Sequence, residues 1–184
     1  MTLNSSQVDV AITGEVSVAP VGTAAPTTST SALNAAFIGL GYINEDGVVI
    51  TPNDTTENII AWQNAAVVRT VYTESFWTFQ FRMIENKGET AELYFKGDVE
   101  VVSAGQWKMT VGAAGPDPRA FVLDVVDGTK HYRYYLANAE VTERGEITNS
   151  NGEAIGYDVT ITAYADSNGV AFTVFTDNAA WGYS

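Results

Sequence analysis

The sequence contains no cysteine and only one histidine in 184 residues. Without cysteine the chain cannot form disulfide bonds, thiolate metal sites or a cysteine nucleophile. Structural zinc is excluded too, because its ligands are Cys and His. The lone histidine, His131, lies within the aromatic stretch 131–135, where no nucleophile and orienting carboxylate are identifiable as triad partners. We therefore expect neither enzymatic activity nor a cofactor.

Acidic residues are so numerous that their spacing says little about a site. With 22 Asp and Glu residues, some pair always meets the separation that glycoside hydrolysis requires. Asp and Asn also cluster at 44–46, 53–54 and 166–168, without the spacing of an EF-hand. We interpret these clusters as turns, with calcium binding as the open alternative.

Positive charge is scarce. Nine Lys and Arg residues stand against the 22 acidic ones, for a formal net charge of −13 at pH 7. A protein that grips nucleic acid needs a basic surface to neutralise phosphates, so specific DNA or RNA binding is not expected. The same charge is compatible with a surface past which nucleic acid slides without sticking.

Long apolar runs are also missing. The longest, around residues 35–40, falls far short of the ~20 residues that a membrane-spanning helix needs. The first residues show neither the basic patch nor the apolar run of a secretory signal. We expect a protein made in the cytoplasm, with no membrane association.

The sequence does have the composition of a globular chain, with 46 % hydrophobic and 17 % charged residues. We predict a single domain over 1–184, with arm and loop-rich assembly segments at about 14–66 and a core at about 67–184. Residues 14–31 are rich in Ala, Pro, Thr, Ser and Gly and include Pro20 and Pro26. They predict an extended arm after a first strand near 7–15, with a floppy linker as the alternative. One or two helical turns are expected near 31–38.

Alternation of apolar and polar residues predicts strands from residue 67 onward. The strongest case is 75–84, where Trp77, Phe79, Phe81 and Met83 share one face. Hairpins are predicted around 104–105, 127–128 and 166–169, with Asp-Gly at 127–128 as the most typical turn.

A single helix interrupts the strands near 87–96. Asn86 is its expected N-terminal cap, and Gly97 its expected end. Short strands with one helix across them indicate a mainly β, α+β fold, an antiparallel sandwich or barrel with one flanking helix.

The tryptophans fall in different settings. Trp77 and Trp107 lie on predicted strands and are expected in the core. Trp62 lies in loop-like sequence, where a large aromatic side chain is a candidate inter-subunit anchor. The alternative is a sugar-stacking platform on a monomeric carbohydrate-binding or adhesion β-sandwich, which predicts a stable monomer instead of concentration-dependent polymers.

Several short strings, in this order, resemble the major tail tube protein of long-tailed bacteriophages, especially the non-contractile, siphovirus-like ones. The resemblance covers roughly residues 14–97. The strings are GTAAP at 22–26, LGYI at 40–43, DG at 46–47, IAWQ at 60–63, VVR at 67–69, FRMIE at 81–85 and LYF at 93–95.

The resemblance implies a β-sandwich of the phage tail tube type, with one flanking helix, an extended N-terminal arm and long loops. It implies a structural virion protein that self-assembles into rings, typically hexamers, which stack into a hollow tube through which DNA passes during infection. Expected partners are copies of the same chain, the tape measure protein and the tail tip and terminator proteins. Residues expected in self-assembly are Trp62, Arg69, Pro20 and Pro26.

Overall fold

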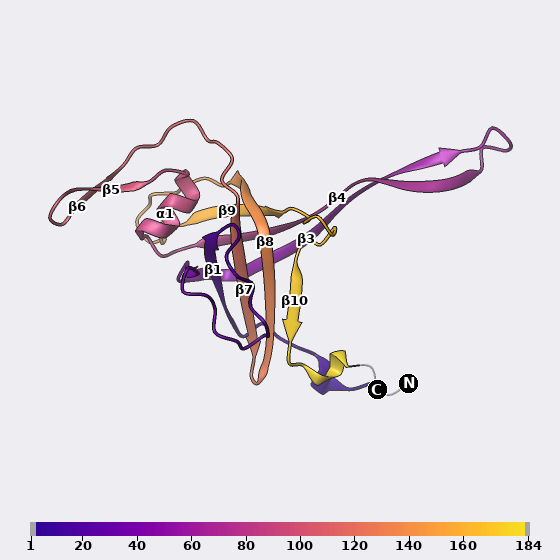
Figure 1. The fold of residues 1–184 in the computed structure, drawn as a ribbon, viewed down its shortest axis with the longest axis horizontal. Coiled ribbons are helices and arrows are strands. Elements are labelled where there is room, and N and C mark those ends of the chain that lie inside the picture. The colour runs from indigo at the N-terminus through magenta and orange to yellow at the C-terminus, as the bar shows by residue number, and fades with distance from the viewer. Residues whose placement is uncertain (1–2, 183–184) are drawn as a thin grey trace.

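The computed structural model describes residues 3–182, which form an eight-stranded antiparallel sheet, a separate two-stranded hairpin and one α-helix (Figure 1). The strands are β1 (Thr13–Pro20), β2 (Ile38–Gly39), β3 (Ile43–Ile60), β4 (Val67–Met83), β5 (Val99–Ser103), β6 (Gln106–Met109), β7 (Arg119–Asp127), β8 (Lys130–Arg144), β9 (Tyr157–Ala163) and β10 (Thr173–Thr176). The helix is α1 (Gly88–Phe95), and short 3-10 turns occur at Ser5–Gln7 and Ala179–Trp181.

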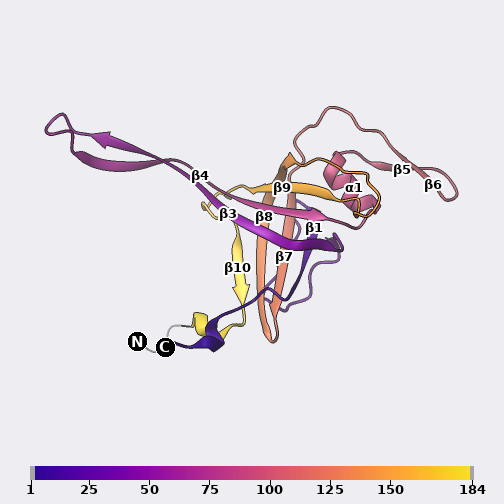
Figure 2. The same ribbon diagram turned by 180° about the vertical axis from the view of Figure 1, so that it is seen from behind.

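The large sheet has the strand order β2-β1-β7-β8-β9-β4-β3, with β10 also paired to β8. Strand β8 divides it into two layers. β7 follows one edge of β8, whereas on the other edge residues 132–135 pair with β10 and residues 139–144 pair with β9. Strands β3, β4 and β9 consequently cross the direction of β1, β7 and β8 (Figures 1 and 2). The predicted mainly β, antiparallel sandwich with a flanking helix is confirmed.

The core lies between these layers. Phe79, Phe81 and Met83 of β4 are buried, and Trp77 of the same face is half-buried, as the alternation predicts. Burying each large apolar side chain contributes roughly 1.5–3 kcal/mol. Phe79 also meets the ring of Phe172 edge to face, with 5.4 Å between centroids. The facing layer and the helix contribute the buried residues Val16, Val18, Leu93, Phe121, Leu123, Leu136 and Val141.

Helix α1 confirms the predicted helix, with both ends shifted by one residue. It starts after Lys87, whose backbone N–H donates to Thr90 Oγ1 at 3.1 Å, and not after Asn86. It ends at Lys96, which adopts the left-handed conformation (φ 54°) in place of the predicted Gly97. Capping by these less typical residues is possible because the buried Thr90 anchors the first turn.

The predicted N-terminal arm is wrong over 14–20, because these residues form most of strand β1. Val16–Ala19 are buried, and β1 pairs with β7 along its whole length. The first strand starts at Thr13, not near residue 7, and 31–38 contain no helix but a turn at 34–37 followed by β2. The strand is hard to recognise from the sequence because small residues such as Ser17 and Ala19 are compatible both with a covered sheet face and with an extended arm.

Residues 21–37 are irregular but are attached to their own subunit. The buried guanidinium of Arg133 is held by Asp124, at 2.6 and 2.9 Å, and donates to the carbonyl oxygens of Thr28 and Ser31 at 3.2 and 2.6 Å. A charge-assisted contact of this kind is worth more than a neutral hydrogen bond. The segment is therefore ordered without a neighbouring copy.

Two of the three predicted hairpins, β5–β6 and β7–β8, are confirmed. The third is wrong: a turn does form at 166–169, but β9 and β10 do not pair with each other. Strand β9 is hydrogen-bonded to β4 on one edge and to β8 on the other, so it has no free edge for β10. Turn signals alone cannot show which edges are already occupied.

Replacing Phe79 by alanine should lower the free energy of unfolding by about 3–5 kcal/mol, because the change leaves a cavity in the core. Phe79 is 1 % exposed. Denaturant titration of the monomeric chain, followed by circular dichroism, measures the change. Gln80→Ala, at the exposed neighbouring position, is the control and should shift it by less than about 0.5 kcal/mol. Equal losses in the two variants would contradict the assignment of the faces.

Candidate assembly surfaces

The β3–β4 hairpin extends well beyond the rest of the sheet. Strand β4 pairs with β9 only over Trp77–Met83, so its first ten residues pair with β3 alone. Residues 53–76 thus form a two-stranded projecting ribbon, which stands out from the body in both views (Figures 1 and 2). At about 3.3 Å per residue, ten residues span roughly 33 Å. That length is enough to reach over an adjacent subunit.

The projecting ribbon is rich in exposed apolar side chains. A two-stranded hairpin is marginally stable in water by itself, and contiguous exposed apolar surface marks an interaction site. The ribbon therefore has the properties of a surface that is completed by a partner. Its exposed residues include Ile59 (51 %), Ile60 (60 %), Trp62 (95 %), Val67 (56 %), Val68 (62 %) and Tyr72 (68 %).

Trp62 lies in the loop at the ribbon end, as the sequence predicts. The loop is closed by a hydrogen bond from Ala61 N to Ala66 O at 2.8 Å, and Asn64 and Ala65 have positive φ angles of 58° and 51°. Positive φ is unfavourable for alanine, so the backbone holds this loop in an unusual shape. The result is a large indole with almost no contact to its own subunit.

The other predicted assembly residues are divided between the ribbon and the body. Arg69 lies on the exposed ribbon, opposite Ile59 and close to the loop of Trp62. Pro20 ends strand β1 and is exposed, whereas Pro26 is buried within the subunit. Trp62 and Arg69 thus lie at the same end of the ribbon, whereas Pro20 lies on the body of the subunit.

The β5–β6 hairpin is a second exposed two-stranded ribbon. The prediction that Trp107 lies in the core is wrong, since its side chain is 64 % exposed, and Val101 and Val102 are 72 % and 58 % exposed. These strands pair with each other and not with the large sheet. Alternation reveals an apolar face, but it cannot tell whether that face meets its own core or another molecule.

One face of the sheet is polar. Residues of β3, β4, β8 and β9 there line a shallow hollow of about 400 Å³. Its floor is linked by side-chain hydrogen bonds, such as Thr142–Thr162 at 2.8 Å and Asn53–Thr78 at 3.0 Å. The lining includes one carboxylate and no Lys or Arg; its polar members are Thr51, Asn53, Thr78, Gln80, Thr142, Glu143, Thr160 and Thr162.

The two terminal segments are tied together beside the β7–β8 turn. Asp9 accepts hydrogen bonds from Lys130, Tyr132 and Asn178, and these bonds hold the pKa of its carboxyl group below the ordinary value. The lone histidine, His131, also contacts the C-terminal segment: its Nδ1 lies 2.8 Å from a carboxylate oxygen of Asp177. Sequence reasoning missed this pairing because 46 residues separate the two partners.

The remaining chemistry of the molecule is sparse. Within residues 3–182 no three Asp, Glu, His or Cys side chains are grouped as a metal site would require. Across the same residues, no helix combines the length and the apolar character needed to cross a bilayer. A β-sandwich that displays exposed apolar two-stranded hairpins has the features of a protein that associates with other subunits.

Comparison with known proteins identifies the family. The sequence model described as "Phage tail tube protein" matches residues 1–183. Because the match covers almost the whole chain, the chain belongs to this family, and its place is the tail of the virion. Membership implies a structural protein that forms homo-oligomers in the tail. Among curated proteins, none matches the chain.

Acidification should loosen the terminal segments before the core. A carboxyl group whose pKa is lowered on folding stabilises the fold above its unfolded-state pKa, and this contribution disappears as the pH falls through the lower folded-state pKa. The ordinary value is 3.8, and Lys130 is the main cause of the lowering. Hydrogen exchange of residues 4–12, corrected for the intrinsic pH dependence, should therefore accelerate below about pH 4.

Asp9→Asn is the matched control for this experiment. The variant removes the titrating group and its ion pair with Lys130, so the segment should exchange fast at neutral pH and show little further change on acidification. Equal protection of residues 4–12 in the variant and the parent chain would show that Asp9 does not hold the segment.

Proposed function

We propose that the chain assembles into rings, hexameric in the manner of the tail tube family, and that the rings stack into the hollow tube of a non-contractile, siphovirus-like tail. The observation that carries the proposal is the projecting ribbon. It is about 33 Å of two-stranded sheet without packing from its own subunit, and its apolar side chains are exposed. Contacts with neighbouring copies would bury this surface and supply the stability that the ribbon lacks alone.

Within the ring, we assign the ribbon end the role of anchor. Trp62 is 95 % exposed, and tryptophan is enriched among residues that dominate binding energy at interfaces. Arg69 and Pro20 remain candidate contacts, because both are exposed. Pro26 is buried in the subunit and would act indirectly, by supporting the segment 21–37.

The polar sheet face supports a role as a conduit. Hydroxyl and amide groups that already bond to one another, with no Lys or Arg among the lining residues, offer DNA phosphates little to bind. The net charge of −13 also disfavours adhesion of DNA. We infer that this face lines the lumen, through which DNA passes without specific binding during infection. The tape measure protein would occupy the same lumen, and tail tip and terminator proteins would cap the ends.

Tube formation is tested by negative-stain electron microscopy and size-exclusion chromatography over a range of concentrations. The purified chain should form rings or hollow tubes. A variant in which residues 57–71 are replaced by Asn-Gly joins the paired positions Thr56 and Tyr72 by a tight turn, and should stay monomeric. A parent chain that stays monomeric at every concentration, like the shortened variant, would contradict the proposal.

Trp62→Ala should raise the concentration needed for assembly by about 30-fold or more, because interface anchors contribute about 2 kcal/mol or more. Sedimentation of polymer from soluble protein measures this concentration. Gln63→Ala, in the same loop, is the matched control and should assemble as the parent does. If both variants assemble normally, Trp62 is not an anchor.

A further inference from the structure

Arg69 stands apart from the other basic side chains of this acidic protein. Of the nine Lys and Arg residues, six form ion pairs and two more donate to backbone carbonyl oxygens. In the described part of the chain, only Arg69 makes neither contact. Its guanidinium is thus an unused positive charge near the end of the projecting ribbon, where Trp62 is exposed as well.

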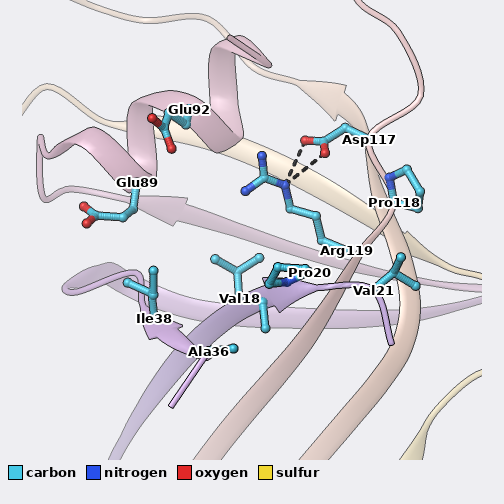
Figure 3. A pocket seen from close by; sticks show the side chains of 11 residues that line it. Val18, Pro20, Val21, Ala36, Ile38, Glu89, Glu92, Asp117, Pro118 and Arg119 are labelled. Atoms are coloured by element: carbon cyan, nitrogen blue, oxygen red, sulfur yellow. Dashed lines mark hydrogen bonds and ion pairs between the residues drawn. The ribbon is translucent and has the colours of Figure 1, made fainter. Parts of the chain in front are cut away.

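A groove between helix α1 and strands β1 and β2 has complementary properties (Figure 3). It has a volume of about 400 Å³, and its floor is apolar, with Val18, Val21 and Ile38 among the lining residues. Val21 and Ile38 are 51 % and 48 % exposed, which is unfavourable for side chains of this kind. Pro20 also lines this space, which we call the acidic groove for the charges along its rim.

The rim of the acidic groove carries unbalanced negative charge. Glu89 and Glu92 line it from the helix, and Asp117 lines it from the approach to β7. Arg119 is the one cation of the lining, and its Nε already donates to Asp117 at 2.9 and 3.1 Å. Three carboxylates against one guanidinium leave a net charge of −2 along the groove.

We propose that the acidic groove receives the ribbon end of a neighbouring copy of this chain, with Trp62 on its apolar floor and Arg69 against Glu89 and Glu92. This inference rests on the proposed self-assembly and names the surfaces that carry it. Trp62 and Arg69 are separated along the ribbon by on the order of 10 Å, a distance that two long side chains can bridge within one site. Trp62, Arg69 and Pro20 come together only across such a contact.

The contact has to be intermolecular. The ribbon leaves the body on the side opposite to helix α1, and both views agree on this (Figures 1 and 2). A contact between two different surfaces of one subunit is heterologous, and heterologous contacts produce closed rings or open filaments. A contact between the ribbon end of one copy and the acidic groove of the next is therefore of the type that builds a ring or a stack of rings.

The β5–β6 hairpin of a neighbour is a weaker fit to the groove. It also exposes a tryptophan, Trp107, but its one cation is already paired: Lys108 Nζ lies 2.8 Å from Glu100. Among residues 3–182, only the ribbon end offers an exposed tryptophan together with a positive charge that has no ion-pair or hydrogen-bond partner. Charge complementarity of this kind selects the partner as well as attracting it.

Cross-linking tests the contact directly, because the parent chain has no cysteine and every cross-link must come from an introduced one. Two single variants, Gln63→Cys at the ribbon end and Ala36→Cys at the groove, are mixed and treated with a short bis-maleimide. We expect a mixed dimer in at least tenfold higher yield than from Gln63→Cys mixed with Asn168→Cys, whose cysteine lies on an exposed turn. Mixing Gln106→Cys with Ala36→Cys tests the β5–β6 hairpin as the occupant of the groove. Equal yields, or a higher yield at position 106, would overturn the proposal.

Charge reversal provides a second, independent test. Arg69→Glu and Glu89→Arg should each raise the concentration needed for assembly by about tenfold, and the double variant should recover most of the loss. Glu153→Arg, on an exposed loop, controls for the added charge and should assemble as the parent does. Failure of the double variant to recover would count against the pairing.

The two proposals can fail separately. If the parent chain forms no rings or tubes by electron microscopy, self-assembly itself is wrong. If tubes form normally but the charge variants and the cross-links behave as their controls, self-assembly stands and the acidic groove is not its contact.

Discussion

The architecture depends on a limit that applies to every β-strand. At each position along its length, a strand can form backbone hydrogen bonds with at most two neighbouring strands, one on each edge. Strand β8 meets this limit with different partners along its length: β7 pairs with residues 130–139 on one edge, and β10 and then β9 pair on the other. The switch turns one sheet into two crossing layers, and the side chains between them become the core. It also leaves β3 at the outer edge, where a long hairpin can continue past the body without disturbing the packing.

Charge follows the same division between body and surface. Most of the few Lys and Arg side chains form ion pairs or hydrogen bonds within their own subunit. Arg133 is an example, since it holds an irregular segment against β7 and β8. What remains outside is mostly negative, apart from the end of the ribbon. A subunit of this kind repels its copies over most of its surface and can attract them at few places, so charge can restrict how copies approach one another.

Local signals predicted much of the fold. The alternation in β4, the Asp-Gly turn before β8 and the single helix are all visible in the sequence, because each depends on neighbours a few residues apart. Strand β1 and the partner of β10 were missed, because they depend on which sheet edge is free. Only part of the proposed assembly surface could be predicted from the sequence. Trp62 is recognisable as an aromatic residue in a loop, but the acidic groove combines residues from 18 to 119, which no local pattern connects.

The unsupported ribbon also has a kinetic consequence for the proposed tube. A two-stranded hairpin gains most of its order from packing, so the first ring must be built from subunits that all lack a template. Later subunits add to a surface that is already fixed. Polymerisation of this type is slow to nucleate and fast to elongate, with a lag that vanishes when a preformed ring is supplied. The number of tubes would then be set by the number of starting complexes, and not by the amount of this chain in the cell.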